Sequence, residues 1–137
     1  MFQQKKLTVK TRGRGTYEIT TDAQNFVRDL CFDAGLLNIF ITHTSASLVV
    51  TENADNDVRT DLETIFAELA PDGDARYLHD AEGPDDMSAH VRSVLTQTSL
   101  SIPFQDKHLQ LGTWQGLFLW EHRTRPHSRR LIFSAVA

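Results

Sequence analysis

Hydrophobic residues along the chain alternate with polar ones in several short segments, and this period of two is typical of strands. Lys5–Lys10 and Thr16–Thr20 carry β-branched and aromatic residues on either side of two glycines, which predicts two strands joined by a turn. Leu36–Thr42 and Leu48–Thr51 are short, apolar and β-branched, so we expect two buried strands there. Leu100–Phe104 predicts a further strand.

Two other segments show the helical period of 3.6 residues. The first begins at Thr21, which stands three residues before Gln24 with the spacing of a capping box, and its apolar positions recur until Gly35. The second is capped by Asp55 and is broken by Pro71. The sequence therefore predicts two amphipathic helices that alternate with the strands.

A third helix is predicted to start near Asp85 or Asp86, with an inner stripe that includes Val91 and Val94. At about 100° per residue, His90 lies roughly 60° from the centre of that stripe. A side chain on the flank of a helix faces a cleft beside the core, so His90 is a candidate for chemistry.

The C-terminal segments Thr113–His122 and Arg129–Val136 resemble the two strands of a hairpin. With the connection placed at Arg123–Ser128, Glu121 would lie opposite Arg130 on one face of that hairpin. The pattern therefore predicts a cross-strand ion pair near the end of the chain.

Length and composition indicate one domain that spans residues 1–137. The formal charge of −4 and the pI near 5.8 give no basic surface for bulk nucleic-acid binding. Cys31 is the only cysteine, so no intramolecular disulfide forms, and a reducing cytoplasmic location is expected. No stretch approaches the roughly 18 apolar residues of a membrane span, and the N-terminus lacks the apolar run of a signal peptide.

Chemically reactive side chains are densest between His79 and His90, where two histidines, four carboxylates and a Gly-Pro turn share one loop and the start of a helix. Imidazole nitrogen and carboxylate oxygen are ligands that divalent transition metals accept. The alternative is that Asp85 and Asp86 stabilise the helix macrodipole and the other acids are merely solvated. The spacing matches no compact motif such as HExxH, so it does not by itself name the ligands.

Three further groups of polar residues offer binding or catalytic side chains, and each also has a purely structural interpretation. His43, Thr44 and Ser45 follow a strand and either bind a ligand or satisfy backbone groups in a turn. Asn53, Asp55 and Asp57 lead into a helix, where they either cap it or hold a phosphate or metal-bound waters.

The third group lies in the C-terminal half. Two glycines bracket Trp114 and Gln115, which indicates either a β-bulge or a site where a ligand approaches the backbone. Glu121 and Arg130 either form an idle pair, or orient a histidine and bind an anion, respectively. Four arginines surround the predicted turn, and most of their charge is expected to be solvated; they are Arg123, Arg125, Arg129 and Arg130.

Six ordered motifs together resemble the YjbQ-like family over essentially the whole chain. They are His43-Thr44-Ser45-Ala46-Ser47, Glu52-Asn53-Ala54-Asp55, His79-Asp80-Ala81-Glu82-Gly83, Asp85-Asp86-Met87-Ser88-Ala89-His90, Leu111-Gly112-Thr113-Trp114-Gln115-Gly116 and Glu121-His122-Arg123. The resemblance implies an α+β fold, in which a single compact domain combines a mixed, strongly curved β-sheet with about three helices. It also implies assembly as a homotrimer with sites near the subunit boundaries.

The resemblance further implies a divalent metal bound by His43, His79 and His90, with zinc expected first and Mg, Mn, Fe or Ni as alternatives. The family is similar to proteins described as secondary thiamine-phosphate synthases, which join hydroxymethylpyrimidine diphosphate to thiazole phosphate and release pyrophosphate. On this hypothesis four acids orient ligands or move protons, and polar side chains bind a small phosphorylated metabolite. The acids are Glu82, Asp55, Asp57 and Glu121, and the binding residues are Thr44, Ser45, Asn53, Gln115 and Arg130.

Two other functions fit the same residues: a metal-assisted hydrolase of a small phosphate ester, and a trimer that binds a metal or metabolite without turnover. The sequence also departs from the family pattern at two positions. Ser88 stands where proline is usual, which loosens the predicted start of the third helix, and Thr51 stands where asparagine often precedes Glu52. Neither departure removes a proposed ligand.

Overall fold

Eight strands and three helices make up the computed structural model, which describes residues 1–137. Their order is β1 (Phe2–Lys10), β2 (Gly15–Glu18), α1 (Thr20–Arg28), β3 (Gly35–Ile41), β4 (Ala46–Glu52), α2 (Asn56–Leu69), α3 (Asp86–Leu95), β5 (Ser99–Gln105), β6 (His108–Leu109), β7 (Gln115–Glu121) and β8 (Ser128–Val136). The α+β fold with three helices is confirmed.

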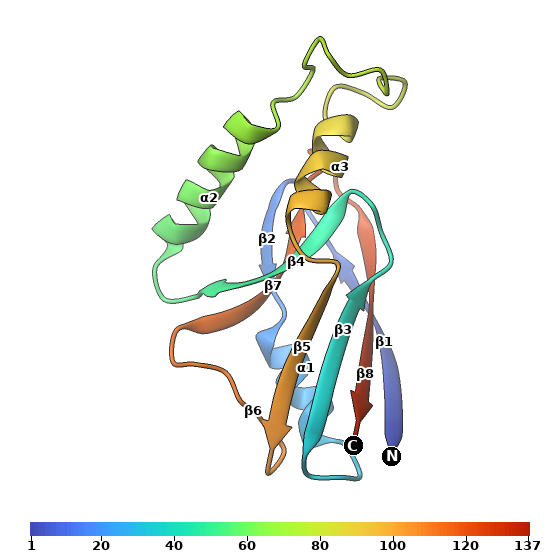
Figure 1. The fold of residues 1–137 in the computed structure, drawn as a ribbon, viewed down its shortest axis with the longest axis vertical. Helices are drawn as coiled ribbons and strands as arrows, with labels where there is room; N and C mark the ends of the chain where they lie inside the picture. Colours follow the sequence, from blue (N-terminus) through green and yellow to red (C-terminus); the bar gives the residue numbers. More distant parts are fainter.

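The strands form two sheets that curl around one core (Figure 1). Sheet A has five strands in the order β1-β8-β3-β5-β6, and sheet B has three in the order β2-β7-β4. Every strand pairing is antiparallel, so the strongly curved sheet was predicted correctly but its mixed character was not. The two chain ends lie side by side, and the Met1 ammonium group donates to the Ala137 carbonyl at 2.7 Å.

Alternation along the strands of sheet A directs one face of the sheet into the core. In β3, Leu37 and Ile39 are fully buried, whereas Leu36 and Phe40 on the opposite face are exposed. Helix α1 covers the inner face, and the ring of its Phe26 packs at 5.7 Å from that of Phe133 in β8. The core therefore lies between α1, the inner face of sheet A and the inward side chains of sheet B.

The first helix differs from its prediction at both ends. It begins at Thr20 and ends at Arg28, with Ile19 at the N-cap position and no side-chain capping bond. Thr21 is therefore not a cap, and Gln24 bonds instead to the β5–β6 turn, accepting from the Leu109 backbone N–H at 3.1 Å. By contrast, Asp55 caps α2 as predicted, because its carboxylate accepts from the Asp57 backbone N–H at 2.9 Å.

The predicted C-terminal hairpin is wrong, because its two strands belong to different sheets. β7 pairs with β2 and β4, and β8 pairs with β1 and β3. Glu121 consequently lies opposite Gly15 and Ala46, while Arg130 lies opposite Thr8. The connection between β7 and β8 is long enough to cross from one sheet to the other, and adjacency in sequence does not reveal this crossing.

Helices α2 and α3 cover the other face of sheet B. α2 stands at the side of the molecule in Figure 1 and has no buried residue. It contacts the sheet through aromatic and polar side chains: the Phe66 and Trp120 rings are 4.7 Å apart edge to face, and Trp120 Nε1 donates to Glu63 at 2.9 Å. The Arg59 guanidinium lies 4.9 Å from the centre of the Phe118 ring.

A buried chain of hydrogen bonds fixes α3 to sheet B. Arg92 of α3 is fully buried, and its Nε donates to His122 Nδ1 at 2.9 Å. The proton of the neutral His122 ring is therefore on Nε2, which donates to Ser47 Oγ at 2.7 Å. Arg92 Nη2 also donates to Glu63 of α2 at 2.5 Å. This network joins both helices to the sheet that supports them.

No helix in this fold combines the length and the apolar character that crossing a membrane requires.

Replacing Leu37 with Ala removes a fully buried side chain from the inner face of β3, and we expect a loss of about 2–5 kcal/mol in the free energy of unfolding. Leu36→Ala is the matched control, because its side chain is 47% exposed on the opposite face, and we expect less than about 1 kcal/mol. Chemical denaturation measures both. Equal losses for the two variants would contradict the assigned facing of β3.

The buried network also makes stability depend on pH. Burial, together with the nearby Arg92 and Arg14 guanidinium groups, lowers the pKa of His122 from 6.5 to about 2. Below pH 6.5 the unfolded chain therefore binds a proton that the folded chain does not, so stability falls as the pH falls. From this residue alone we expect a slope approaching about 1.4 kcal/mol per pH unit between about pH 6 and 4.

Denaturation curves at several pH values measure this slope, and NMR of the His122 ring measures its protonation directly. The ring signals should keep their neutral positions down to about pH 4. In the His122→Gln variant the slope should become shallower, even if that variant is less stable at every pH. A His122 ring that becomes protonated at the ordinary histidine pKa would contradict the assignment.

Candidate metal centre

Four side chains from one loop and the helix that follows it converge on a common point. They are His79, Glu82, Asp86 and His90, and one potential ligand atom of each lies within 4.8 Å of every other. Asp86 Oδ2 is 2.7 Å from His79 Nε2 and 3.1 Å from His90 Nε2, and Glu82 Oε2 is 3.6 Å from His79 Nε2. Metal-to-ligand bonds of about 2.0–2.1 Å in a tetrahedral site put neighbouring ligand atoms about 3.3 Å apart. The printed separations lie on both sides of that value, so the four side chains form a group that could hold a divalent metal after small shifts.

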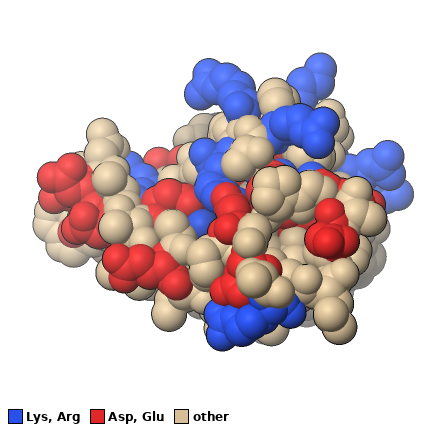
Figure 2. All heavy atoms as spheres, turned by 90° about the horizontal axis from the view of Figure 1, so that it is seen from above, with Lys and Arg blue, Asp and Glu red and all other residues tan.

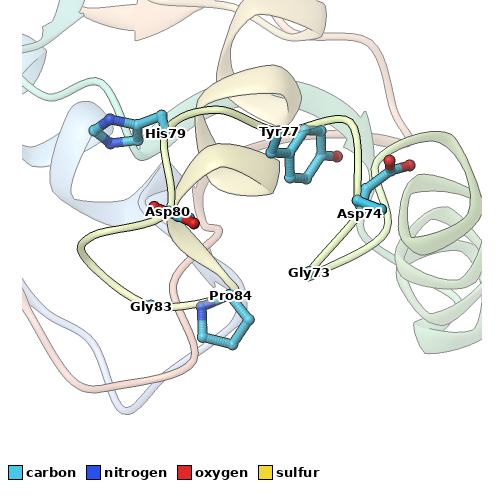
Figure 3. A pocket seen from close by; sticks show the side chains of 8 residues that line it. Gly73, Asp74, Tyr77, His79, Asp80, Gly83 and Pro84 are labelled. Atoms are coloured by element: carbon cyan, nitrogen blue, oxygen red, sulfur yellow. The ribbon is translucent and has the colours of Figure 1, made fainter.

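Helix α3 supplies two of these ligands from one face, because Asp86 and His90 are four residues apart. The loop before α3 brings the other two. Its Gly83 has a φ of +103°, a backbone conformation that favours glycine, and it lies between Glu82 and the buried Asp85. Figure 3 shows this loop folding over a hollow of about 400 Å³, with the His79 ring pointing away from Tyr77 and Asp74.

His90 is oriented by a backbone carbonyl. Its Nδ1 donates to the Thr44 carbonyl at 2.9 Å, so in the neutral ring Nε2 carries a lone pair. That lone pair faces Asp86 Oδ2, another acceptor, at 3.1 Å. Two acceptors at this distance repel each other unless a proton or a cation lies between them. A proton on Nε2, which makes an imidazolium–carboxylate pair, satisfies this contact, and so does a bound cation, so the donor set is compatible with a cation at this point.

Asp86 is held from its other side by Arg123. The carboxylate is nearly fully buried, and its Oδ1 accepts from Arg123 Nη1 at 2.7 Å, which leaves Oδ2 for the two imidazoles. Burial alone would raise the pKa of Asp86, but hydrogen bonding with His79 and the charges of His90 and Arg123 keep this pKa below its usual value. Asp86 is therefore an anion at neutral pH, as a metal ligand must be.

Arg123 also fixes the loop itself. Its Nε donates to Asp85 Oδ2 at 3.1 Å, and its Nη2 donates to the Glu82 carbonyl at 2.9 Å. Burial alone would raise the pKa of Asp85, but hydrogen bonds from Thr124 and Arg123 hold it well below its usual range. The expectation that Arg123 is solvated was wrong, because its side chain is 12% exposed and joins the first residue of α3 to the loop of residues 79–85, the metal loop, at Glu82 and Asp85.

Ser88 gives the loop another anchor. Its hydroxyl donates to the Asp72 carboxylate, which also forms a two-point ion pair with Arg14 at 2.8 and 3.0 Å. Ser88 therefore ties the start of α3 to the segment that follows α2.

His43 does not join the group of four. Its Nε2 accepts from the Arg130 backbone N–H at 2.8 Å, and its Nδ1 lies 3.4 Å from Arg129 Nη1. Burial and the Arg129 charge lower the pKa of His43. It borders a hollow of about 230 Å³ that His90 also lines, so it lies near the group with its ring nitrogens directed elsewhere.

Glu121 and Arg129 form the buried ion pair that the sequence assigned to Glu121 and Arg130. Arg129 Nε donates to Glu121 at 2.8 Å, and Arg129 Nη2 donates both to Glu121 and to Ser45 Oγ, the latter at 3.0 Å. Thr11 adds a hydrogen bond to the same carboxylate at 2.7 Å. Both residues of the pair are buried, so Glu121 and Arg129 hold the Ser45 turn in place.

The remaining predicted site residues lie elsewhere in the molecule. Asn53 and Gln115 lie at the far ends of β4 and β7, about 20 Å along the strand from Ser47. Gln115 accepts from the Gly112 backbone N–H at 2.8 Å, and Asn53 donates to Glu18 at 3.3 Å. Asp55 and Asp57 form the start of α2 at that end. None of the four approaches the metal loop.

Sequence reasoning did not assign three important residues of this site to their roles. Asp86 was counted among the four carboxylates of the dense segment but was not named as a ligand, although its four-residue spacing from His90 on a predicted helix already placed both on one face. Arg123 gave no such signal, because it meets the metal loop through a contact between residues 37 positions apart. Arg129 was missed because the predicted hairpin paired Glu121 with Arg130, whereas β7 and β8 belong to different sheets.

Comparisons with known proteins agree on one relationship. The family model described as UPF0047 protein YjbQ-like matches residues 5–137. A UPF0047 protein of Synechocystis sp. is 50% identical over 129 residues, which cover 94% of this chain and 88% of that protein. UPF0047 protein YjbQ of Escherichia coli O157:H7 is 43% identical over 133 residues, 96% of each chain.

Solved structures show the same fold. A conserved hypothetical protein of Thermus thermophilus is 34% identical with a TM-score of 0.83, covering 93% of this chain and 96% of that one. An uncharacterized conserved protein of the yjbq/upf0047 family from Clostridium acetobutylicum is 28% identical with a TM-score of 0.88, covering 96% and 98%. The sequence match over nearly the whole length places this chain in the UPF0047 YjbQ-like family.

Proposed function

We propose that the chain binds a divalent metal ion, zinc first, through His79, Glu82, Asp86 and His90, and uses it to act on a small phosphorylated metabolite. The observation that carries this proposal is the convergence of these four side chains, in which one potential ligand atom of each lies within 4.8 Å of every other around the buried Asp86 carboxylate. Histidine and carboxylate together are a donor set that zinc and other transition metals accept.

The proposed ligand set revises the one implied by the family resemblance. His79 and His90 remain, Asp86 and Glu82 join them, and His43 becomes a neighbour that supports the adjacent turn. Glu82 is the most exposed of the four carboxylate and imidazole groups, with 64% of its side chain exposed, so it is the ligand that could give way to a substrate. The alternative metals Mg, Mn, Fe and Ni stay within the proposal.

The reaction carried over from the resemblance is the joining of hydroxymethylpyrimidine diphosphate to thiazole phosphate with release of pyrophosphate. A bound divalent ion supplies Lewis acidity that withdraws charge from a diphosphate leaving group. The chain's own residues hold the proposed ligands in position: the Thr44 carbonyl fixes the orientation of the His90 ring, and Arg123 fixes the orientation of the Asp86 carboxylate. A hydrolase of a phosphate ester and a non-catalytic metal-binding homotrimer are the rival functions.

Metal binding is tested by competition with a chromophoric chelator on untreated and zinc-loaded protein. We expect His79→Ala and Asp86→Asn each to weaken zinc binding by more than about 100-fold, because loss of a ligand costs more than the roughly 10–100-fold typical of an outer partner. His108→Ala is the matched control, since this exposed histidine lies in β6 and bonds only to its own turn. Its zinc affinity should stay within about twofold of the parent protein.

His43→Gln separates the two ligand sets. If the group of four holds the metal, zinc affinity in this variant should fall by less than about tenfold, the lower limit for an outer partner. A loss as large as that of His79→Ala would restore His43 as a ligand. A parent protein that takes up no divalent ion would end the proposal.

Activity is tested by incubating the metal-loaded protein with the two thiamine precursors. Formation of thiamine phosphate and pyrophosphate that disappears on chelation and in His79→Ala supports the transferase. Product from a single phosphate ester supports the hydrolase instead. Unchanged substrates with tightly held metal would favour the binding protein, and full turnover by a metal-free His79→Ala variant would remove the metal from the mechanism.

A further inference from the structure

A cleft of about 570 Å³ opens beside the candidate metal centre. One wall is the metal loop at Glu82 and Gly83, and the other is the β7–β8 connection at Arg123, Arg125 and His127. Glu82 belongs both to this wall and to the group of four, so the cleft adjoins the metal position directly. Its volume is within the range of pockets that hold small molecules.

The cleft is lined by basic groups of two kinds. Arg123 is fully engaged, because its guanidinium donates to Asp85, Asp86 and the Glu82 carbonyl. Arg125 is exposed, and no hydrogen bond or ion pair involves its guanidinium. It is therefore the free cation of the cleft, while Arg123 shapes the wall. Figure 2 looks onto this end of the molecule and shows Lys and Arg side chains beside the acidic ones.

His127 adds a second group with a free ring nitrogen. Its Nδ1 donates to the Arg125 carbonyl at 2.8 Å, which leaves Nε2 without a protein partner. The same bond ties the His127 ring to the backbone that carries Arg125. The only acid that lines the cleft is Glu82, and in the proposed centre its charge is directed to the metal. His127 Nδ1 also lies 3.7 Å from the buried Glu121 carboxylate, so Arg125 is the positive charge of the cleft that has no acidic partner in the protein.

We infer that Arg125 and His127 bind the phosphate group of the metabolite whose reacting part lies at the metal. This inference rests on the proposed function and assigns its phosphate-binding residues. Guanidinium groups bind phosphate through two parallel hydrogen bonds, which a phosphate at this wall would receive from Arg125. Arg130, the residue that the sequence suggested for this role, borders a different hollow with Lys6 and Thr42 on sheet A.

The probe is methyl phosphate, titrated by calorimetry into metal-free and zinc-loaded protein. We expect Arg125→Gln to weaken methyl phosphate binding by about tenfold or more, because a charge-assisted hydrogen bond is lost, and His127→Gln to weaken it by a smaller factor. Zinc affinity should be unchanged in both variants. Arg28→Gln is the matched control, since it removes one exposed positive charge from α1 and should leave methyl phosphate binding unchanged.

The outcomes separate this inference from the proposed function. Methyl phosphate binding that Arg125→Gln leaves intact, or that Arg28→Gln reduces equally, overturns the inference even when zinc binds. No binding of methyl phosphate to either form of the parent protein overturns it as well. If the parent protein binds no zinc, and Arg125→Gln weakens its binding of methyl phosphate, the phosphate site is supported and the metal centre is overturned. A parallel titration with acetate tests whether the site prefers a carboxylate. Tighter binding of acetate than of methyl phosphate would indicate a carboxylate site and would overturn the phosphate assignment.

Discussion

The Asp86 carboxylate is the constraint on which the candidate site depends. It is buried at the first turn of α3, where one oxygen accepts from Arg123 and the other faces two imidazoles. A buried carboxylate needs compensating positive charge, and Arg123 provides it only as long as β7 and the metal loop stay in contact. The ion pair between Asp86 and Arg123 thus connects the end of sheet B to the loop that carries the candidate ligands.

Two buried polar networks extend this support into the body of the domain. Arg92 and His122 join α3 to sheet B, and Glu121 and Arg129 join β7 to β8 below the Ser45 turn. Each network contains groups with almost no exposed surface, so each would be costly if any member lost its partner. At this end of sheet B the apolar core gives way to buried ion pairs, so the candidate metal centre lies beside charged groups that are already held in place.

The amino-acid sequence determined the elements that local physics controls. Local patterns predicted the strands β3 and β5, the cap of α2 and the approximate start of α3, because these depend on residues close together in the chain, although Leu36 and Phe40 of the strand expected to be buried are exposed. It also identified the His79 to His90 segment, since its density of ligand-type side chains is a property of composition. The ordered motifs gave the family and, through it, the α+β fold.

Only the tertiary structure decided how these parts meet. The β7–β8 connection crosses between sheets, which moved the partner of Glu121 from Arg130 to Arg129 and brought Arg123 to the metal loop. His43 was separated from the other two histidines because its ring is bound to the Arg130 backbone, and Asp86 took the central position. Contacts between residues far apart in sequence are set by packing of the whole chain, and no local pattern of side chains encodes them.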